Sequence, residues 1–199
     1  EDAIGFGISI ECLKYISESA AEVFESCSEE VCQLISDAIS FEDQFVFNEV
    51  CNLIILLSKY AFESIEPIFN DLTTFLLGSC NYLEAFVCLE NVLKFSNKPP
   101  ASYGEFIGSL VELLNGESQI PQHLIYMVID CVNSIVRKIE STDVNLYTEF
   151  RQVLIEIMEN SPDSRSSVYR CFASFSRIAA QAVSEDIEPF ANAMIEDLS

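Results

Sequence analysis

The chain has 199 residues, of which 50% are hydrophobic, and its 32 Asp and Glu against 10 Lys and Arg give a formal net charge of -22. This charge repels phosphate backbones and anionic lipid headgroups, which argues against nucleic acid and membrane surfaces as partners. The high apolar content argues against disorder. The longest apolar run, residues 51–57, is far shorter than the roughly 20 residues that a membrane-spanning helix needs.

Five of the eight cysteines recur along the chain with a period. They are separated by 39, 37, 43 and 40 residues, and they are Cys12, Cys51, Cys88, Cys131 and Cys171. Apolar residues follow them at offsets of one, four, five and eight positions, and these offsets lie on one face of an α-helix. The pattern predicts five helices, each of which buries its cysteine as a small hydrophobic residue.

The cysteines fit neither a disulfide framework nor a zinc site. Helix axes in a stack lie about 8 to 10 Å apart, whereas a disulfide requires Cα atoms roughly 4.4 to 6.8 Å apart. The chain has no Cys-x-x-Cys pair, and His123 is its single histidine. Cys27 and Cys80 lie outside the periodic register, near helix boundaries, so we expect the reactive thiols there, whereas Cys32 takes an apolar position of its own helix.

A second kind of helix alternates with the cysteine-containing kind. Its first core position recurs with steps of 37, 38, 44 and 40 residues, at Val31, Ile68, Phe106, Phe150 and Phe190. The residue before that position is Pro or Glu in each copy, namely Glu30, Pro67, Glu105, Glu149 and Pro189. Proline is tolerated in a first helical turn, and Glu suits the positive end of the helix dipole. We call these helices the first helices, and the cysteine-containing ones the second helices.

Helical pairs that repeat every 37 to 44 residues, without strand signals between them, predict an all-α fold. The expected architecture is an α-α superhelix, a HEAT or armadillo-type solenoid, with about five helical hairpins of ~40 residues. Neither helix of a pair can bury its apolar face alone, so stacking supplies the core. We expect residues 1–199 to form a single solenoid fragment. The start at Glu1 on a second helix indicates an interior slice of a longer protein.

Two passages resemble the β-karyopherins, the importin and exportin family of nuclear transport receptors. They are RSSVYRCFASFSRIAAQAVSEDIEPFANAMIEDL from Arg165 and EVCNLIILLSKYAFESIEPIFNDLTTFLL from Glu49. In each, an apolar helix ends, a short acidic turn follows and a Pro-led helix begins, which is similar to the inter-repeat step of those receptors. Other HEAT scaffolds, such as phosphatase scaffold subunits, share this pattern.

The resemblance implies a binding protein rather than an enzyme. In the family, the first helices form the convex outer wall and the second helices line a concave channel. Protein cargo and the GTPase Ran bind the concave side, and phenylalanine-glycine segments of nucleoporins bind between outer helices. The resemblance therefore implies a receptor for protein cargo that works in the cytoplasm and the nucleus. The alternative is a HEAT scaffold subunit, phosphatase-type or other, without a transport role.

The open face of the second helices is where a partner is expected to bind. The best-placed acceptors for a basic cargo segment are Glu11, Glu18, Glu90 and Asp130. In the alternative interpretation, these carboxylates pair with Lys14, Lys94 and Arg137 of adjacent repeats. On the same face, Val50, Leu53 and Leu57 form an apolar triplet that is either buried under a neighbouring helix or a binding patch.

The sequence offers no pattern typical of catalysis, cofactor binding or metal binding. Six glycines leave little room for a phosphate-binding loop. A Ser-His-Asp arrangement depends on His123, which lies in a turn-like stretch. Paired carboxylates are expected on any strongly acidic solenoid surface. We therefore expect no enzymatic activity, no cofactor and no metal.

Overall fold

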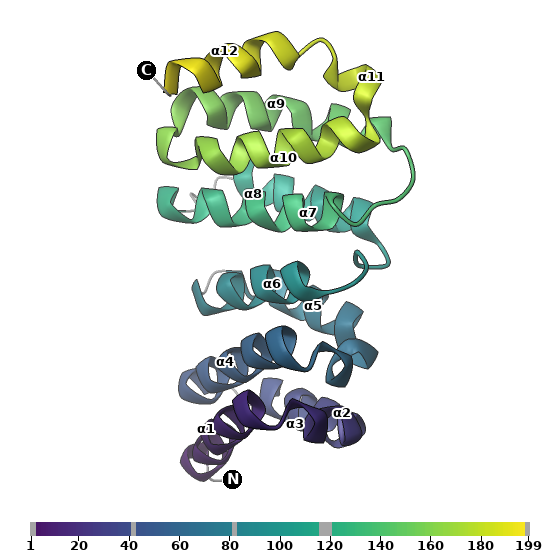
Figure 1. The fold of residues 1–199 in the computed structure, drawn as a ribbon. Helices are drawn as coiled ribbons and strands as arrows, with labels where there is room; N and C mark the ends of the chain where they lie inside the picture. Colours follow the sequence, from purple (N-terminus) through teal and green to yellow (C-terminus); the bar gives the residue numbers. More distant parts are fainter. Residues whose placement is uncertain (1–2, 41–42, 81–82, 116–120, 198–199) are drawn as a thin grey trace. The chain divides into compact units, whose positions relative to one another are not determined.

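The computed structural model describes residues 3–40, 43–80, 83–115 and 121–197 and divides the chain into two compact units, Glu1–Ser96 and Asn97–Ser199 (Figure 1). The described residues form helices, turns and loops, with no strand among them. Each unit is a set of α-helices packed against one another. The all-α, solenoid-like fold predicted from the sequence is therefore confirmed. One solenoid running through both units stays a prediction.

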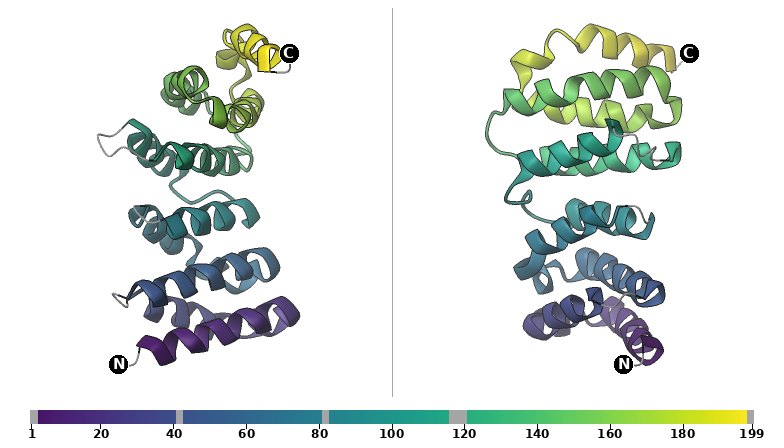
Figure 2. Two further views of the ribbon diagram at one scale, coloured as in Figure 1. Left: turned by 90° about the vertical axis from the view of Figure 1, so that its left-hand side faces the viewer. Right: turned by 180° about the vertical axis from the view of Figure 1, so that it is seen from behind.

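Unit 1 contains six α-helices within its described residues. They are α1 (Ala3–Ser19), α2 (Ala21–Ser26), α3 (Ser28–Ile39), α4 (Gln44–Tyr60), α5 (Phe69–Gly78) and α6 (Leu83–Phe95), with short 3₁₀ turns at Phe62–Ser64 and Glu66–Ile68. The second helices α1, α4 and α6 lie side by side, as Figures 1 and 2 show. The first helices α3 and α5 pack against α4 and α6, respectively.

Unit 2 contains the other six α-helices of the described chain. They are α7 (Tyr103–Asn115), α8 (Gln122–Val136), α9 (Val144–Asn160), α10 (Arg165–Ile178), α11 (Ala180–Val183) and α12 (Ile187–Asp197), with a 3₁₀ turn at Pro162–Ser164. The second helices α8 and α10 are neighbours, and the first helix α9 packs against α7 and α10. All ten helices expected from the two periodic patterns are therefore present among the described residues. The additional short helices α2 and α11 each precede a first helix.

The core of each unit contains the periodic cysteines of its second helices. Cys51 and Cys88 are buried in unit 1, and Cys131 and Cys171 are buried in unit 2, at exposed fractions of 2% or less. Burial raises the pKa of Cys88 and of Cys171 well above the ordinary value. The thiols of Cys88 and Cys171 are therefore neutral, and all four cysteines are buried as the sequence pattern predicts.

The apolar triplet of α4 is also buried. Val50, Leu53 and Leu57 are 2%, 1% and 0% exposed on a helix that packs against both α1 and α6. The triplet is part of the helix-to-helix packing of unit 1, which rules out the alternative that it is a binding patch.

Cys12 is exposed, so the prediction that it is buried is wrong. The helix α1 packs on α4 through a different side, on which Gly7 and Ile10 are buried. A Cβ atom at position 7 would lie 2.3 Å from Cε1 of Phe45, so a larger residue there would require this exposed ring to shift. Lys14 on the same side forms an ion pair with Glu49 of α4. This packing turns Cys12 outward.

The prediction that Cys80 is a reactive thiol is also wrong. Its side chain is 8% exposed, and burial raises its pKa to about 12, so the thiolate is scarce at neutral pH. Cys27 is exposed between α2 and α3, in accord with the prediction. Cys32 is buried, also in accord, and its Sγ donates a hydrogen bond to the carbonyl oxygen of Ser64 at 3.3 Å.

The expected result of thiol titration under native conditions is rapid reaction of two cysteines, Cys12 and Cys27, because the other six are buried. Full unfolding exposes all eight. An Ellman-type assay with the Cys12→Ser/Cys27→Ser variant as control measures this directly. Rapid reaction of a third thiol in the folded wild-type protein would contradict the assigned burial.

The proline steps mark where the first helices begin, with one shift in register. Pro189 lies in the first turn of α12, whereas Pro67 lies in the 3₁₀ turn Glu66–Ile68 that precedes α5. The tighter 3₁₀ turn rotates the following residues, so Phe69 at 1% exposed takes the core position predicted for Ile68, which is half-buried. Both prolines are exposed, as is expected for a helix start.

Candidate protein-binding surface

The four acidic residues predicted to bind cargo are spread over both units. Glu11 is exposed on α1, and Glu90 is half-buried on α6, both in unit 1. Asp130 is half-buried on α8 in unit 2. The side chain of Glu18 lies outside the described residues. The structure therefore places Glu11, Glu90 and Asp130 on second helices, each within its own unit.

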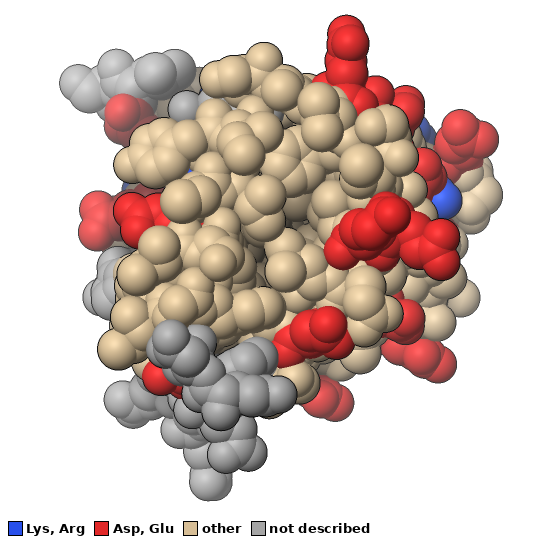
Figure 3. Space-filling model, turned by 90° about the horizontal axis from the view of Figure 1, so that it is seen from below, with Lys and Arg blue, Asp and Glu red and all other residues tan. Residues whose placement is uncertain are grey.

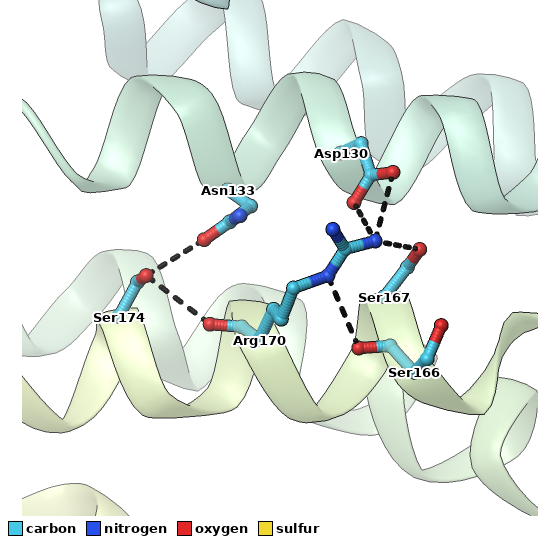
Figure 4. Close-up of polar contacts among 6 residues, drawn as sticks. All are labelled: Asp130, Asn133, Ser166, Ser167, Arg170 and Ser174. Carbon is cyan, nitrogen blue, oxygen red and sulfur yellow. Dashed lines mark hydrogen bonds and ion pairs between the residues drawn. The ribbon is translucent and has the colours of Figure 1, made fainter.

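Asp130 is held by an arginine of the next second helix. The Nη2 atom of Arg170 on α10 lies 3.2 Å from each carboxylate oxygen of Asp130 and 3.0 Å from Oγ of Ser167 (Figure 4). The arginine side chain is 60% exposed and the aspartate side chain 15%. This is the pairing between adjacent repeats that the alternative interpretation expected, although the partner is Arg170 rather than Arg137.

Two further contacts continue this polar seam along α8 and α10. Ser174 lies with its hydroxyl 2.6 Å from Oδ1 of Asn133, one turn beyond the ion pair (Figure 4). Another turn on, Nη2 of Arg177 donates to the carbonyl oxygen of Val136 at 2.8 Å. Because the positions advance by three or four residues on both helices, the contacts line one side of each helix. The seam fixes the two second helices of unit 2 against each other.

Positive charge gathers near the C-terminal ends of these two helices. Arg137 and Arg177 are exposed, and Lys138 follows directly. Burial, followed by the charge of Arg137, lowers the pKa of Lys138 to about 8. Cations at helix C-termini also interact favourably with the helix dipole. In a chain of net charge -22, this end of α8 and α10 is a local exception to the acidic surface.

Unit 1 uses a comparable ion pair between neighbouring second helices. Nζ of Lys14 on α1 lies 2.6 Å from Oε2 of Glu49 on α4, and the two side chains are 20% and 14% exposed. Lys14 was one of the cations expected to pair between repeats, and it pairs with Glu49 of the neighbouring second helix. In both units, charges on the second helices stabilise the stack.

A buried polar cluster in unit 2 was missed in the sequence. Arg151 of α9 contacts both carboxylate oxygens of Asp186 through Nε and Nη2 at 2.6 Å, and the hydroxyl of Tyr147 donates to Asp186 at 2.6 Å. The guanidinium holds the pKa of Asp186 below its ordinary value, and burial raises that of Tyr147. A recurring Tyr and Asp could have revealed the cluster, since the hydroxyl of Tyr103 lies 3.4 Å from Asp143 one repeat earlier.

The cluster joins two helices of unit 2. Asp186 is 3% exposed, precedes α12, and accepts through its backbone carbonyl from the N–H of Phe190 at 3.2 Å. Its carboxylate accepts three hydrogen bonds, two from Arg151 and one from Tyr147. It thereby ties the start of α12 to α9.

We expect the Asp130–Arg170 pair to stabilise unit 2 only weakly, because Arg170 is largely exposed. A double-mutant cycle with Asp130→Ala and Arg170→Ala should give a coupling free energy of about 0.5 kcal/mol in urea unfolding. High salt should reduce it. The matched cycle of Asp130→Ala with Arg177→Ala should give a coupling near zero, and equal coupling in the two cycles would contradict the assigned pairing.

Within the described residues, no group of three or more His, Cys, Asp or Glu side chains is arranged to hold a metal ion. In that same part of the chain, no helix has both the length and the apolar character to cross a membrane. What the geometry offers is a polar surface along packed second helices, on which Glu49 and Asp130 are held in ion pairs and Arg137, Arg170 and Arg177 are exposed. Searches against protein-family models, curated proteins and solved structures found no match to this chain.

Proposed function

We propose that this chain is a protein-binding solenoid segment of a nuclear transport receptor of the β-karyopherin type. The observation that carries the proposal is the alternation of first and second helices, with the second helices packed side by side in each unit. Such stacks expose an extended surface that suits large protein partners. The resemblance of the two proline-led steps to the importin and exportin family supplies the transport role.

The surface charges indicate which side chains of a cargo would fit. On α8 and α10, Arg137, Arg170 and Arg177 are exposed, whereas Asp130 is engaged by Arg170. We therefore propose that this part of unit 2 contacts acidic side chains of the cargo. In unit 1, the exposed Glu11 is the first candidate to contact basic side chains.

The proposed mechanism is binding and partner exchange without covalent chemistry. By the same resemblance, the further partners are GTP-loaded Ran and the phenylalanine-glycine segments of nucleoporins, and the site of action is the cytoplasm and the nucleus. The second helices are the proposed surface for cargo and Ran. The outer first helices are the proposed surface for nucleoporin segments.

A pulldown with the full-length protein tests the transport role. The baits are GTP-loaded Ran and a phenylalanine-glycine repeat peptide, with GDP-loaded Ran and a peptide in which serine replaces phenylalanine as controls. The proposal expects retention by GTP-loaded Ran, by the phenylalanine-glycine peptide or by both, and none by either control. Retention by neither bait would overturn the transport role and favour a HEAT scaffold subunit.

A further inference from the structure

The polar seam between α8 and α10 keeps a constant register along both helices. Its cross-helix contacts join residues that lie 40, 41 and 41 positions apart in the chain, namely Asp130 with Arg170, Asn133 with Ser174 and Val136 with Arg177 (Figure 4). The same register places Arg137 level with Arg177, because Arg137 directly follows Val136. Two arginines therefore face each other where the seam ends.

The guanidinium of Arg177 lies directly beside Arg137. Its Nη2 atom donates to the carbonyl oxygen of Val136 at 2.8 Å, and that carbonyl carbon is bonded to the backbone nitrogen of Arg137. Both arginines are exposed, and Arg137 is the C-terminal cap of α8. In the part of the chain that the structure describes, neither forms an ion pair. We call Arg137 and Arg177 the arginine pair.

Two turns earlier, the seam shows which group its arginines accept. Nη2 of Arg170 lies 3.2 Å from both carboxylate oxygens of Asp130 (Figure 4). In the arginine pair, Arg137 takes the place on α8 that Asp130 has in this contact, so a second cation stands where a carboxylate would fit. The two cations repel, and the negative ends of the helix dipoles offset this only in part. A carboxylate brought by another molecule would remove the repulsion and accept hydrogen bonds from both guanidiniums.

The charge of the whole chain limits what this molecule can be. The net charge is -22, and Figure 3 shows one face on which Asp and Glu side chains prevail. Nucleic acid, or a second copy of this chain, would bring many negative charges against such a surface. A short acidic peptide segment brings only a few. At physiological salt, where the screening length is about 8 Å, those few charges interact mainly with the seam itself.

We infer that the arginine pair binds the carboxylate of an acidic side chain in a short acidic segment of a partner protein. A second acidic side chain of the segment reaches Arg170, whose Nη1 atom has no hydrogen-bond partner among the described residues (Figure 4). Arg170 and Arg177 lie two helical turns apart, about 10 Å along the axis of α10. In a polyproline II chain, residues i and i+3 lie on one side about 9 Å apart. The segment therefore carries Glu or Asp at positions i and i+3.

This inference rests on the proposed binding of acidic cargo side chains at unit 2, and it deepens that proposal by naming the group bound and its spacing. It does not depend on Ran or on nucleoporin segments. The pulldown that tests the transport role and the peptide titration that tests the arginine pair can therefore fail independently.

A peptide titration followed by NMR tests the arginine pair. The probe is a 12-residue serine peptide with two glutamates three positions apart, added to the ¹⁵N-labelled protein at physiological salt. A peptide with glutamine in place of both glutamates is the control. The glutamate peptide should shift the Nε–Hε signals of Arg137, Arg170 and Arg177, and it should bind about fivefold or more tightly than the glutamine peptide.

Three variants locate the binding. Arg137→Gln/Arg177→Gln should weaken binding of the glutamate peptide about fivefold or more, because it removes both guanidiniums of the arginine pair. Asp130→Asn should tighten binding about twofold to threefold, because it removes the carboxylate that competes for the neighbouring arginine. Lys59→Gln/Lys94→Gln removes the same charge from the last turns of α4 and α6 in unit 1 and should change binding by less than about twofold. Circular dichroism confirms that the variants fold.

Several results would overturn the inference. No binding of the glutamate peptide would remove the site, and equal affinity for the glutamine peptide would remove the carboxylate as the bound group. Equal losses in the two double variants would mean attraction by net charge alone. Binding of a phosphoserine peptide about tenfold more tightly than the glutamate peptide would assign the arginine pair to a phosphorylated partner. Dimerisation of the wild type in analytical ultracentrifugation, abolished by Arg137→Gln/Arg177→Gln, would assign it to a second copy.

Discussion

Replacement of Asp186 by alanine is expected to lower the free energy of unfolding of unit 2 by about 2 to 3 kcal/mol. The substitution leaves the buried hydroxyl of Tyr147 without its acceptor and removes both contacts of the Arg151 guanidinium. Breaking a fully buried ion pair costs about 3 to 5 kcal/mol, and the 43% exposure of the arginine side chain reduces this value. Urea unfolding followed by circular dichroism measures the change.

The exposed Asp163 supplies the matched control for this substitution. Asp163→Ala should change the free energy of unfolding by less than about 0.5 kcal/mol. Tyr147→Phe should give an intermediate loss of about 1 kcal/mol, because it removes one hydrogen bond and leaves the ion pair in place. Equal effects of Asp186→Ala and Asp163→Ala would show that the cluster does not form.

The contribution of Asp186 to the free energy of unfolding is expected to decrease at acidic pH. Arg151, by hydrogen bonding, holds the pKa of the folded carboxyl below its ordinary value, so the folded state favours the ionised form. The stabilisation is therefore complete above the unfolded pKa of about 4 and is lost as the pH falls through the lower folded pKa. The difference in unfolding free energy between the wild type and Asp186→Asn should be constant from pH 5 to 7 and shrink below pH 4. An increase on acidification would contradict this assignment.

The second large effect is expected in the aromatic core of unit 2. Phe175 is fully buried, and its ring centroid lies 5.4 Å from that of Tyr147 and 5.9 Å from that of Phe150. Phe175→Ala removes these contacts between α9 and α10 and leaves a cavity, which should lower the free energy of unfolding by about 3 to 5 kcal/mol. Tyr126→Ala at an exposed position of α8 should have little effect. A small change at Phe175 in urea unfolding would contradict the packing of α9 on α10.

The fold was largely predictable because helical periodicity and repeat length are both encoded locally. Cys51, Cys88, Cys131 and Cys171 each occupy the same position on the apolar face of a second helix. This local pattern was sufficient to predict the second helices and their buried side. The start of a first helix at Pro189 likewise depends on the geometry of one residue. Such signals do not require knowledge of which segment packs against which.

The errors arise where neighbouring helices determine the outcome. The rotation of α1 is set by its packing on α4, which buries Gly7 and Ile10 and leaves Cys12 exposed. The core position moves from Ile68 to Phe69 because a 3₁₀ turn replaces the first α-helical turn. Neither feature follows from apolar spacing.

The candidate surface was less predictable than the fold. Asp130 was correctly placed on a second helix. Its ion-pair partner is Arg170 rather than Arg137 because of the way α8 and α10 pack side by side, which the sequence does not specify. The cluster of Asp186 with Tyr147 and Arg151 joins residues that lie 39 and 35 positions apart. The signal in the sequence that could have revealed it is the recurrence of a Tyr and an Asp one repeat earlier, at Tyr103 and Asp143.

Hydrogen exchange followed by mass spectrometry tests the alternation of first and second helices most directly. We expect separate slowly exchanging segments at the second helices α4, α6, α8 and α10 and at the first helices α3, α5, α7 and α9, with fast exchange in the turns between them. Their spacing should follow the 37 to 44-residue repeat of the sequence. Slow exchange that runs continuously through those turns, or fast exchange throughout α4 and α10, would contradict a chain built from repeated helical pairs.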